Sequence, residues 1–337
     1  MMELSSRLKS YRKGAWGKSK PVDEDGRIKA IDQFRGFAII LMVIINFGTT
    51  IESVPSWLKH APDVGLYFAD LGAPAFIFAI GLTYGLSFHR RTARDGLSAA
   101  IGHFVRRYLA ILGIGAIFSA GKFMIGMSES AVDWGVLQTL GCCGLITLLV
   151  IRLPTGIRIA VGLALLVVYQ LFLDAYWLDR VLSVTHGGLL GSLSWSVILI
   201  LATVFADVYY NMDRRKYFPL LSFLTFLAGF VLALIVPVSK MRVSASYDLV
   251  TLGFCGIVFS EFYLTNFDLR YFAAWGKNPL LLYFLGLLMT GLFMLPGIPW
   301  WHAEAPLWLA GLQAAALVLV LGALARYWDN RGFKFSL

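Results

Sequence analysis

Two side chains early in the sequence have the types and spacing of an acid–base pair. His60 follows the first long apolar run of the chain, and Asp70 lies ten residues later, just inside the second run. A carboxylate beside a histidine fixes its tautomer and stabilises the imidazolium that forms when the ring accepts a proton. Because a carboxylate in an apolar run is costly without a partner, we expect Asp70 to hold His60 as a general base. An ordinary surface histidine is the alternative interpretation of His60.

A polar stripe follows the first apolar run. Asp32 and Arg35 are three residues apart and share one helical face, and Asn46 comes 11 residues after Arg35, or about three helical turns. The stripe would cover about 16 Å along the helix axis. It predicts polar groups from one end of this helix toward the other, as a site that crosses a membrane requires. The alternative is an ion pair at the helix end and a separate hydrogen bond between helices.

The sequence W-G-K-N-P-L at residues 275–280 predicts a helix that begins at Pro279. Asparagine is favoured as an N-cap and proline at the first helical position, so Lys277 and Asn278 lie at the positive end of the helix dipole. Free backbone N–H groups and an ammonium at such an end predict an anion-binding site. A simple cap beside a lysine is the alternative. Gln138 opens another apolar run, and we interpret it as a hydrogen-bonding link between helices.

Membrane-spanning helices must position these polar groups. Of the 337 residues, 58% are hydrophobic and 15% are charged, whereas soluble domains carry about 45–50% apolar and about 25% charged residues. The sequence therefore predicts an all-α polytopic membrane protein with ten transmembrane helices. The ten apolar runs are centred on residues 36–51, 65–87, 108–127, 133–151, 157–173, 189–206, 218–237, 246–264, 279–295 and 305–325.

The distribution of basic residues predicts the orientation. The two tails and the loops after the even-numbered runs hold 22 Lys and Arg residues, and the loops after the odd-numbered runs hold five. This bias places both termini in the cytoplasm and His60 on the far side. We expect a basic, unstructured cytoplasmic arm at residues 1–30, a transmembrane domain at 31–327 and a short cytoplasmic tail at 328–337. Because the net charge of +9 reflects this topology, we expect no nucleic-acid partner.

The sequence lacks the motifs of several other functions. No histidine or cysteine pair has the spacing of metal ligands, and neither a Walker loop nor a G-x-S-x-G motif is present. We therefore expect no metal, and acid–base catalysis and transport remain. Transporters often contain internal repeats, whereas the D-x-x-R-G sequence at 32–36 has no counterpart in the second half. This difference favours an enzyme, with a small-molecule transporter as the competing class.

Several segments resemble the heparan-α-glucosaminide N-acetyltransferase family of transmembrane acyltransferases. They occur in the family's order and span most of the chain. Ala30 replaces the family's usual serine, and D-L-G-A-P at 70–74 replaces a bulkier D-L-V-F-P. The matching segments are R-I-K-A-I-D-Q-F-R-G at 27–36, A-D-L-G-A-P-A-F-I-F-A-I-G at 69–81, G-V-L-Q at 135–138, G-S-L at 191–193 and G-K-N-P-L-L-L-Y at 276–283.

The resemblance implies transfer of an acetyl group from cytoplasmic acetyl-CoA to an amino sugar on the extracytoplasmic side. It assigns the active-site histidine to His60 and the active-site asparagine to Asn46. We expect Asn46 to stabilise the oxyanion and Asp70 to orient His60. Donor contacts are expected from Arg35, Lys277, Asn278 and Asp32.

Several features of this activity stay open. O-acylation of a cell-surface polysaccharide is the nearest alternative activity, and an acyl-histidine intermediate is an alternative mechanism. The compact chain indicates a multi-pass protein of the bacterial cytoplasmic (inner) membrane. The family precedent suggests a homodimer.

Overall fold

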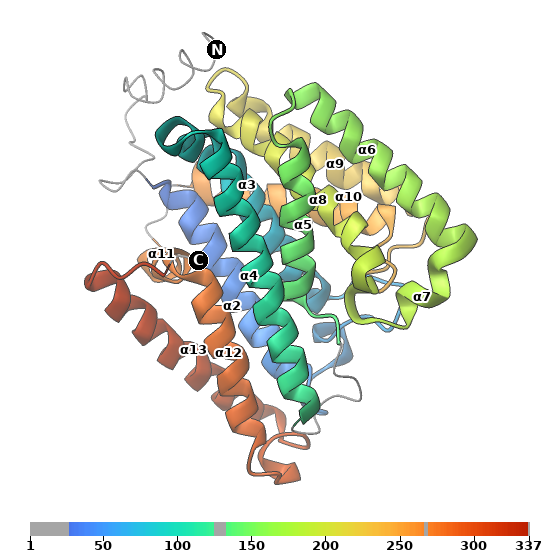
Figure 1. The fold of residues 1–337 in the computed structure, drawn as a ribbon. Helices are drawn as coiled ribbons and strands as arrows, with labels where there is room; N and C mark the ends of the chain where they lie inside the picture. The colour runs from blue at the N-terminus through green and yellow to red at the C-terminus, as the bar shows by residue number, and fades with distance from the viewer. Residues whose placement is uncertain (1–26, 125–132, 266–268, 336–337) are drawn as a thin grey trace.

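The computed structural model describes residues 27–124, 133–265 and 269–335, and in these ranges the chain is built from helices. The expected basic arm at residues 1–30 lies almost wholly outside the described residues. Figure 1 shows the helices as one bundle. In chain order they are α2 (Lys29–Gly48), α3 (Gly72–Asp95), α4 (Leu97–Met124), α5 (Val136–Val150), α6 (Thr155–Phe172), α7 (Leu178–Leu182), α8 (Gly188–Tyr210), α9 (Phe218–Leu232), α10 (Ala245–Leu264), α11 (Arg270–Lys277), α12 (Pro279–Met294) and α13 (Leu307–Asn330).

The expected all-α membrane fold is confirmed. Each of the ten apolar runs contains a long helix, and eight helices of the described chain are long and apolar enough to span a membrane. The pair α11 and α12 adds a ninth span if it is counted as one broken helix, with a bend of 91°. The remaining run, at residues 133–151, forms α5, whose 15 residues cover about 22 Å and therefore fall short of the roughly 30 Å hydrocarbon core.

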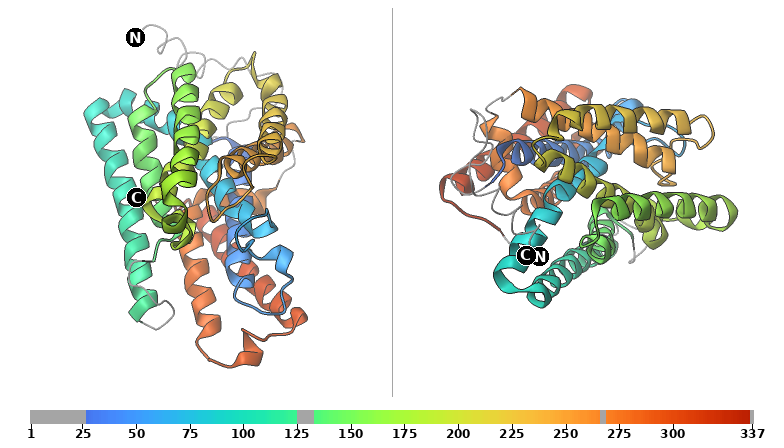
Figure 2. Two further views of the ribbon diagram at one scale, coloured as in Figure 1. Left: turned by 90° about the vertical axis from the view of Figure 1, so that its right-hand side faces the viewer. Right: turned by 90° about the horizontal axis from the view of Figure 1, so that it is seen from above.

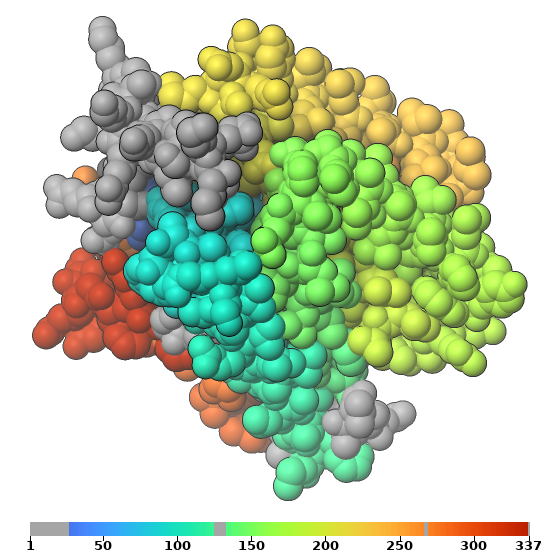
Figure 3. Space-filling view, turned by 45° about the horizontal axis from the view of Figure 1, so that its top comes forward, coloured from blue at the N-terminus to red at the C-terminus, as the bar shows by residue number. Residues whose placement is uncertain are grey.

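Helix α8 forms the centre of the bundle. In its apolar window 83% of the residues are buried, against 28% for the window that contains α6 and 17% for the one that contains α9. It packs against α3, α5, α6 and α10. Seen from above, α9 and α10 lie side by side, and α6 extends away from the bundle (Figure 2). The space-filling view shows α3 and α4 between the red α13 and the green α6 (Figure 3). The exposed apolar faces of α6 and α9 are therefore suited to lipid.

Two glycines bring α11 into backbone contact with α2. A Cβ atom at Gly36 would lie 1.8 Å from the carbonyl oxygen of Phe272, and a Cβ at Gly276 would lie 1.8 Å from that of Asp32. Only hydrogen fits at either position, as in other close helix contacts in membranes. The contact places the end of α11, and with it Lys277, beside the polar start of α2.

Candidate active site

The loop between α2 and α3 brings His60 and Asp70 together, although the two residues lie ten positions apart. His60 Nδ1 is 2.8 Å from Asp70 Oδ1. The other carboxylate oxygen, Oδ2, accepts hydrogen bonds from the backbone N–H groups of Tyr67 at 2.9 Å and Ala61 at 3.2 Å. Asp70 lies in the short 3-10 helix Phe68–Leu71 that leads into α3 and is fully buried, whereas 36% of the His60 side chain is exposed. These donors stabilise a carboxylate that fixes the histidine ring through Nδ1.

A second loop, between α9 and α10, is fastened to the loop that carries His60. Asp63 Oδ1 accepts hydrogen bonds from Arg242 Nε at 2.8 Å and from Ser239 Oγ at 2.9 Å. Gly65 N–H donates to the carbonyl of Val238 at 2.7 Å, and Gly65 forms a parallel β-bridge with Ser239. The arginine lowers the pKa of the Asp63 carboxyl, so this connection is ionic at neutral pH. It fixes the intervening Lys240 relative to His60.

Lys240 lies against the His60 ring and was missed by sequence reasoning. Its Nζ is 3.0 Å from His60 Nδ1, 3.2 Å from Nε2 and 3.9 Å from Asp70 Oδ1. Burial lowers the pKa of Lys240 to about 8, although Asp70 opposes this shift. Burial also lowers the pKa of His60, with a smaller contribution from the charge of Lys240 and an opposing one from Asp70. At neutral pH the site therefore holds a neutral imidazole beside an ammonium.

Asn46 and His60 line one cavity of about 250 Å³, the outer cavity, which lies at the Asn46 end of α2. The Asn46 amide is 3.5 Å from the hydroxyl of Tyr283, which is long for a hydrogen bond. Its N–H groups are therefore available to a group in the cavity. The further polar residues on the wall, from four other parts of the chain, are Ser119, Lys122, Asp133, Gln138, Thr185, His186 and Lys240.

One signal in the sequence pointed to the missed cations of this cavity. Lys122 and Lys240 are among the five Lys and Arg residues that the charge bias assigns to the far side. A cation on that side runs against the positive-inside rule. His186 has no comparable signal. Its backbone adopts a φ of 57°, which only the folded chain reveals.

Gln138 links helices, as expected. Its Nε2 donates to Ser119 Oγ on α4 at 2.8 Å and to the carbonyl of Asp133 at 3.0 Å, and its Oε1 accepts from Gly135 N–H at 3.1 Å. These bonds join α4 to the start of α5. The side chain also forms part of the outer cavity wall.

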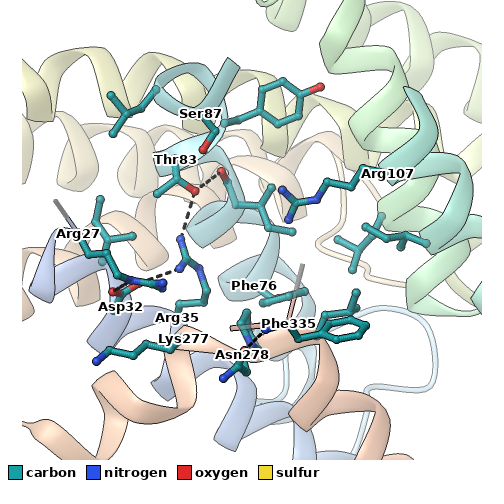
Figure 4. A pocket seen from close by; sticks show the side chains of 18 of the residues that line it. Arg27, Asp32, Arg35, Phe76, Thr83, Ser87, Arg107, Lys277, Asn278 and Phe335 are labelled. Carbon is teal, nitrogen blue, oxygen red and sulfur yellow. Dashed lines mark hydrogen bonds and ion pairs between the residues drawn. The ribbon is translucent and has the colours of Figure 1, made fainter. Parts of the chain in front are cut away.

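A larger inner cavity, of about 370 Å³, lies at the other end of α2 and is strongly basic. Figure 4 shows Arg35 and Arg107 reaching into it from α2 and α4. Aromatic rings of Phe76, Tyr84, Phe104, Tyr108 and Phe335 also line it. Its charged lining residues are Arg27, Asp32, Arg35, Arg90, Arg107 and Lys277. Five cations against one carboxylate suit a phosphorylated ligand with an aromatic base.

Asp32 and Arg35 meet, as their spacing indicates. Arg35 Nη1 donates to Asp32 Oδ1 at 2.9 Å and to the carbonyl of Gly276 at 3.2 Å, and Nη2 donates to Thr83 Oγ1 at 3.2 Å. Asp32 also pairs with Arg27 Nε at 2.7 Å. The carboxylate therefore holds two arginines at the cavity wall, which makes it a positioning group for them.

Lys277 and Asn278 have partners that the sequence did not indicate. Lys277 forms an ion pair with Asp329 at the end of α13. Helix α12 begins at Pro279 as expected, but the Asn278 side chain does not cap it. Instead, Asn278 Nδ2 donates to the carbonyl of Phe333 at 3.1 Å, and its Oδ1 accepts from Phe335 N–H at 2.7 Å. This amide fastens the returning C-terminal segment against the inner cavity.

The inner and outer cavities follow one another along the same four helices. On α2 the lining passes from Arg35 to Asn46, and on α12 it passes from Leu280 to Tyr283. On α4 it passes from Ile111 to Gly115, and α5 likewise contributes to both cavities. The polar stripe of α2 thus has a cavity at each end. Within the described ranges, no group of three or more His, Cys, Asp or Glu residues is arranged to hold a metal ion.

The model of one known protein family matches most of this chain. The model described as heparan-alpha-glucosaminide N-acetyltransferase, catalytic, matches residues 27–285, which include both cavity-lining ends of α2. The chain belongs to this family. The matched range ends within α12, so α13 and the C-terminal segment that closes the inner cavity lie outside it.

Two of the curated relatives carry the name of this family. The chain is 33% identical to heparan-alpha-glucosaminide N-acetyltransferase of Mus musculus and 34% identical to that of Homo sapiens, each over 123 residues and 34% of this chain. It is 24% identical over 206 residues, or 54% of this chain, to GPI-anchored wall transfer protein 1 of Cryptococcus neoformans var. grubii. The matches span 18%, 17% and 34% of the mouse, human and fungal proteins.

Proposed function

We propose that this protein is a transmembrane acetyltransferase that moves the acetyl group of cytoplasmic acetyl-CoA to an amino sugar or related glycan on the opposite side. Membership of the acetyltransferase family supports the reaction class. The observation that carries the mechanism is the contact of His60 with Asp70 on the wall of the cavity that also contains Asn46. We expect the host membrane to be a bacterial cytoplasmic membrane and the working form to be a homodimer.

The inner cavity is proposed to bind the nucleotide end of acetyl-CoA. Arg35, Arg107 and Lys277 carry positive charge on its wall, and arginines bind phosphate through paired N–H groups. The aromatic rings there offer faces on which adenine stacks. Asp32 contributes by holding Arg35, and Asn278 by holding the C-terminal segment.

The outer cavity is proposed to contain the reacting atoms. The extended pantetheine arm follows the stripe on α2 and places the thioester between Asn46 and His60. His60 Nε2 removes the proton from the attacking amine, Asp70 stabilises the imidazolium, and the Asn46 amide donates to the oxyanion. Removing one such oxyanion donor costs about 10² to 10³ in rate.

Donor binding and transfer test this function separately. We would titrate detergent-purified protein with acetyl-CoA and CoA by calorimetry, and follow transfer to D-glucosamine by mass spectrometry. Arg107→Ala is expected to weaken binding at least tenfold, and Arg91→Ala, which alters an arginine paired with Asp95 on the surface, serves as the matched control. His60→Ala is expected to abolish transfer and leave donor binding unchanged.

The outcomes discriminate among the candidate functions. Acetylation of N-acetylglucosamine but not of D-glucosamine would assign a hydroxyl acceptor and the O-acyltransferase alternative. Folded protein that binds neither acetyl-CoA nor CoA would refute the acetyltransferase and favour transport.

A further inference from the structure

We propose that Lys240 is the general acid that protonates the departing CoA thiolate and then recovers its proton from His60. The inference rests on the acetyl transfer proposed above and adds a second catalytic group to it. Lys240 is 6% exposed, lies on the wall of the outer cavity and comes from a loop 180 residues away from His60 in the chain.

The orientation of the ammonium leaves it free to act on a ligand. Lys240 Nζ is almost equally distant from the two ring nitrogens of His60, at 3.0 and 3.2 Å. An in-line hydrogen bond to one nitrogen would not produce this symmetry, so the ammonium lies across the ring. An ammonium carries three N–H donors. The contacts that the structure describes for Nζ involve His60 and Asp70, which leaves donor capacity for a group in the cavity.

A purely structural role explains this lysine poorly. Asp70 receives its short hydrogen bonds from His60 and two backbone N–H groups, and Lys240 Nζ is farther away, at 3.9 Å. The bond between Gly65 and Val238 and the pair between Asp63 and Arg242 already fasten the two loops. Lys240 is therefore not needed to satisfy the carboxylate or to join the loops.

The surroundings of Lys240 favour release of its proton, because the effect of burial outweighs the opposing charge of Asp70. His60 and Asp70 contact it, and His186, Lys122 and Asp133 face the same cavity from three other elements. Burial lowers the pKa of Lys240 to about 8, close to the value of about 8.5 for a cysteine thiol. An acid whose pKa matches that of the leaving group transfers its proton efficiently near neutral pH.

The complete acetyl transfer conserves atoms and protons. The neutral amine attacks the thioester carbonyl, and His60 Nε2 takes one N–H proton from the attacking nitrogen. The C–S bond breaks as Lys240 Nζ gives a proton to sulfur, so the products are the amide and CoA thiol. His60 is then an imidazolium beside a neutral amine at 3.2 Å. Transfer of that proton from Nε2 to Nζ, once the lysine side chain has swung into line with the Nε2–H bond, restores both groups.

The test compares donors that differ in their need for an acid. S-acetylpantetheine releases an alkyl thiolate, whereas S-acetyl-4-nitrothiophenol releases an aryl thiolate that leaves without protonation. Both lack the nucleotide, so the inner cavity affects them alike. Rates of acetyl transfer to D-glucosamine would be measured for the wild type, Lys240→Met, Lys240→Arg and the control Lys59→Met. Lys59 belongs to the loop that carries His60, and its ammonium donates to the backbone carbonyl of Glu52.

General-acid catalysis predicts a selective loss. Lys240→Met should lower kcat about 100-fold with acetyl-CoA and S-acetylpantetheine but less than threefold with the aryl donor. Lys240→Arg should behave like Lys240→Met, because a guanidinium keeps its charge but does not release its proton in this pH range. The fall in wild-type kcat above pH 8 should disappear in both variants.

The remaining outcomes distinguish failure of the proposed role of Lys240 from failure of the proposed acetyl transfer. Equal losses with the alkyl and aryl donors, or full activity of Lys240→Arg, would show that Lys240 acts through structure or charge and overturn the inference while acetyl transfer stands. A wild type that transfers acetyl from acetyl-CoA to no glucosamine-type acceptor would refute the proposed function itself.

Discussion

At the scale of single residues, the site holds a buried carboxylate against an imidazole whose pKa is lowered. Asp70 is fully buried but accepts two backbone hydrogen bonds besides its contact with His60. Burial and Lys240 lower the pKa of His60, and Asp70 raises it. A base acts only when it is unprotonated, so activity should persist as pH falls and be lost as pH passes through this lowered pKa.

Replacing the carboxylate tests this balance. In Asp70→Asn the side chain no longer stabilises the imidazolium or selects the tautomer, so we expect kcat to fall about 10³-fold. The acidic limb of the pH profile of kcat/KM should move to lower pH, because the group that raises the pKa of His60 is gone. Donor binding by calorimetry should stay within twofold. An unchanged acidic limb would show that Asp70 does not act on His60.

At the scale of elements, the inner cavity depends on the crossing of α11 and α2. In Gly276→Ala the new methyl group would meet the carbonyl oxygen of Asp32, so α11 must move and carry Lys277 away from Arg35. We expect a loss of stability of about 1–3 kcal/mol and weaker binding of acetyl-CoA, measured by thermal unfolding and calorimetry in detergent. Gly291→Ala on α12 is the matched control, since open space surrounds that position. Equal behaviour of the two variants would contradict the role of the crossing.

The joined outer loops form the second element on which the site depends. Asp63→Arg would repel Arg242 and release the loop that carries Lys240 from the loop that carries His60. We expect kcat for acetyl transfer to fall at least tenfold, with donor affinity unchanged because the inner cavity is remote. The double variant Asp63→Arg, Arg242→Asp re-forms the ion pair and should recover most of the activity. Failure of this exchange to restore kcat would show that the pair does not position the site.

The sequence predicted elements and local pairs well, and long-range pairs poorly. Each of the ten apolar runs indicated a helix, because a segment that lies in lipid must satisfy its own backbone hydrogen bonds. Helical spacing predicted that Asp32 meets Arg35, and the cost of a buried carboxylate indicated its partner His60. Lys240 was missed because its loop reaches His60 only after the seven intervening helices, α3 to α9, have packed. The partners of Asn278 were missed for a similar reason, since the C-terminal segment must first return along α13.

At the scale of the whole molecule, the proposed function assigns donor and acceptor to two cavities at opposite ends of α2. The basic inner cavity opens beside the start of α2, and the acid–base site lies beyond the other end of the same helix. Helices α2, α4, α5 and α12 line both. Such an arrangement lets a donor that cannot cross the membrane deliver its acetyl group to an acceptor on the other side.

Reconstituted vesicles test this division directly. We expect external acetyl-CoA to acetylate D-glucosamine trapped in the lumen, because molecules whose inner cavity faces outward accept the donor there and release the product inside. Lumenal N-acetylglucosamine would be measured by mass spectrometry after external acceptor is removed. Vesicles with His60→Ala control for leakage of acetyl-CoA. If acetylation occurs only when donor and acceptor share one side, the cavities do not form a path across the membrane, and transfer must take place at a single face.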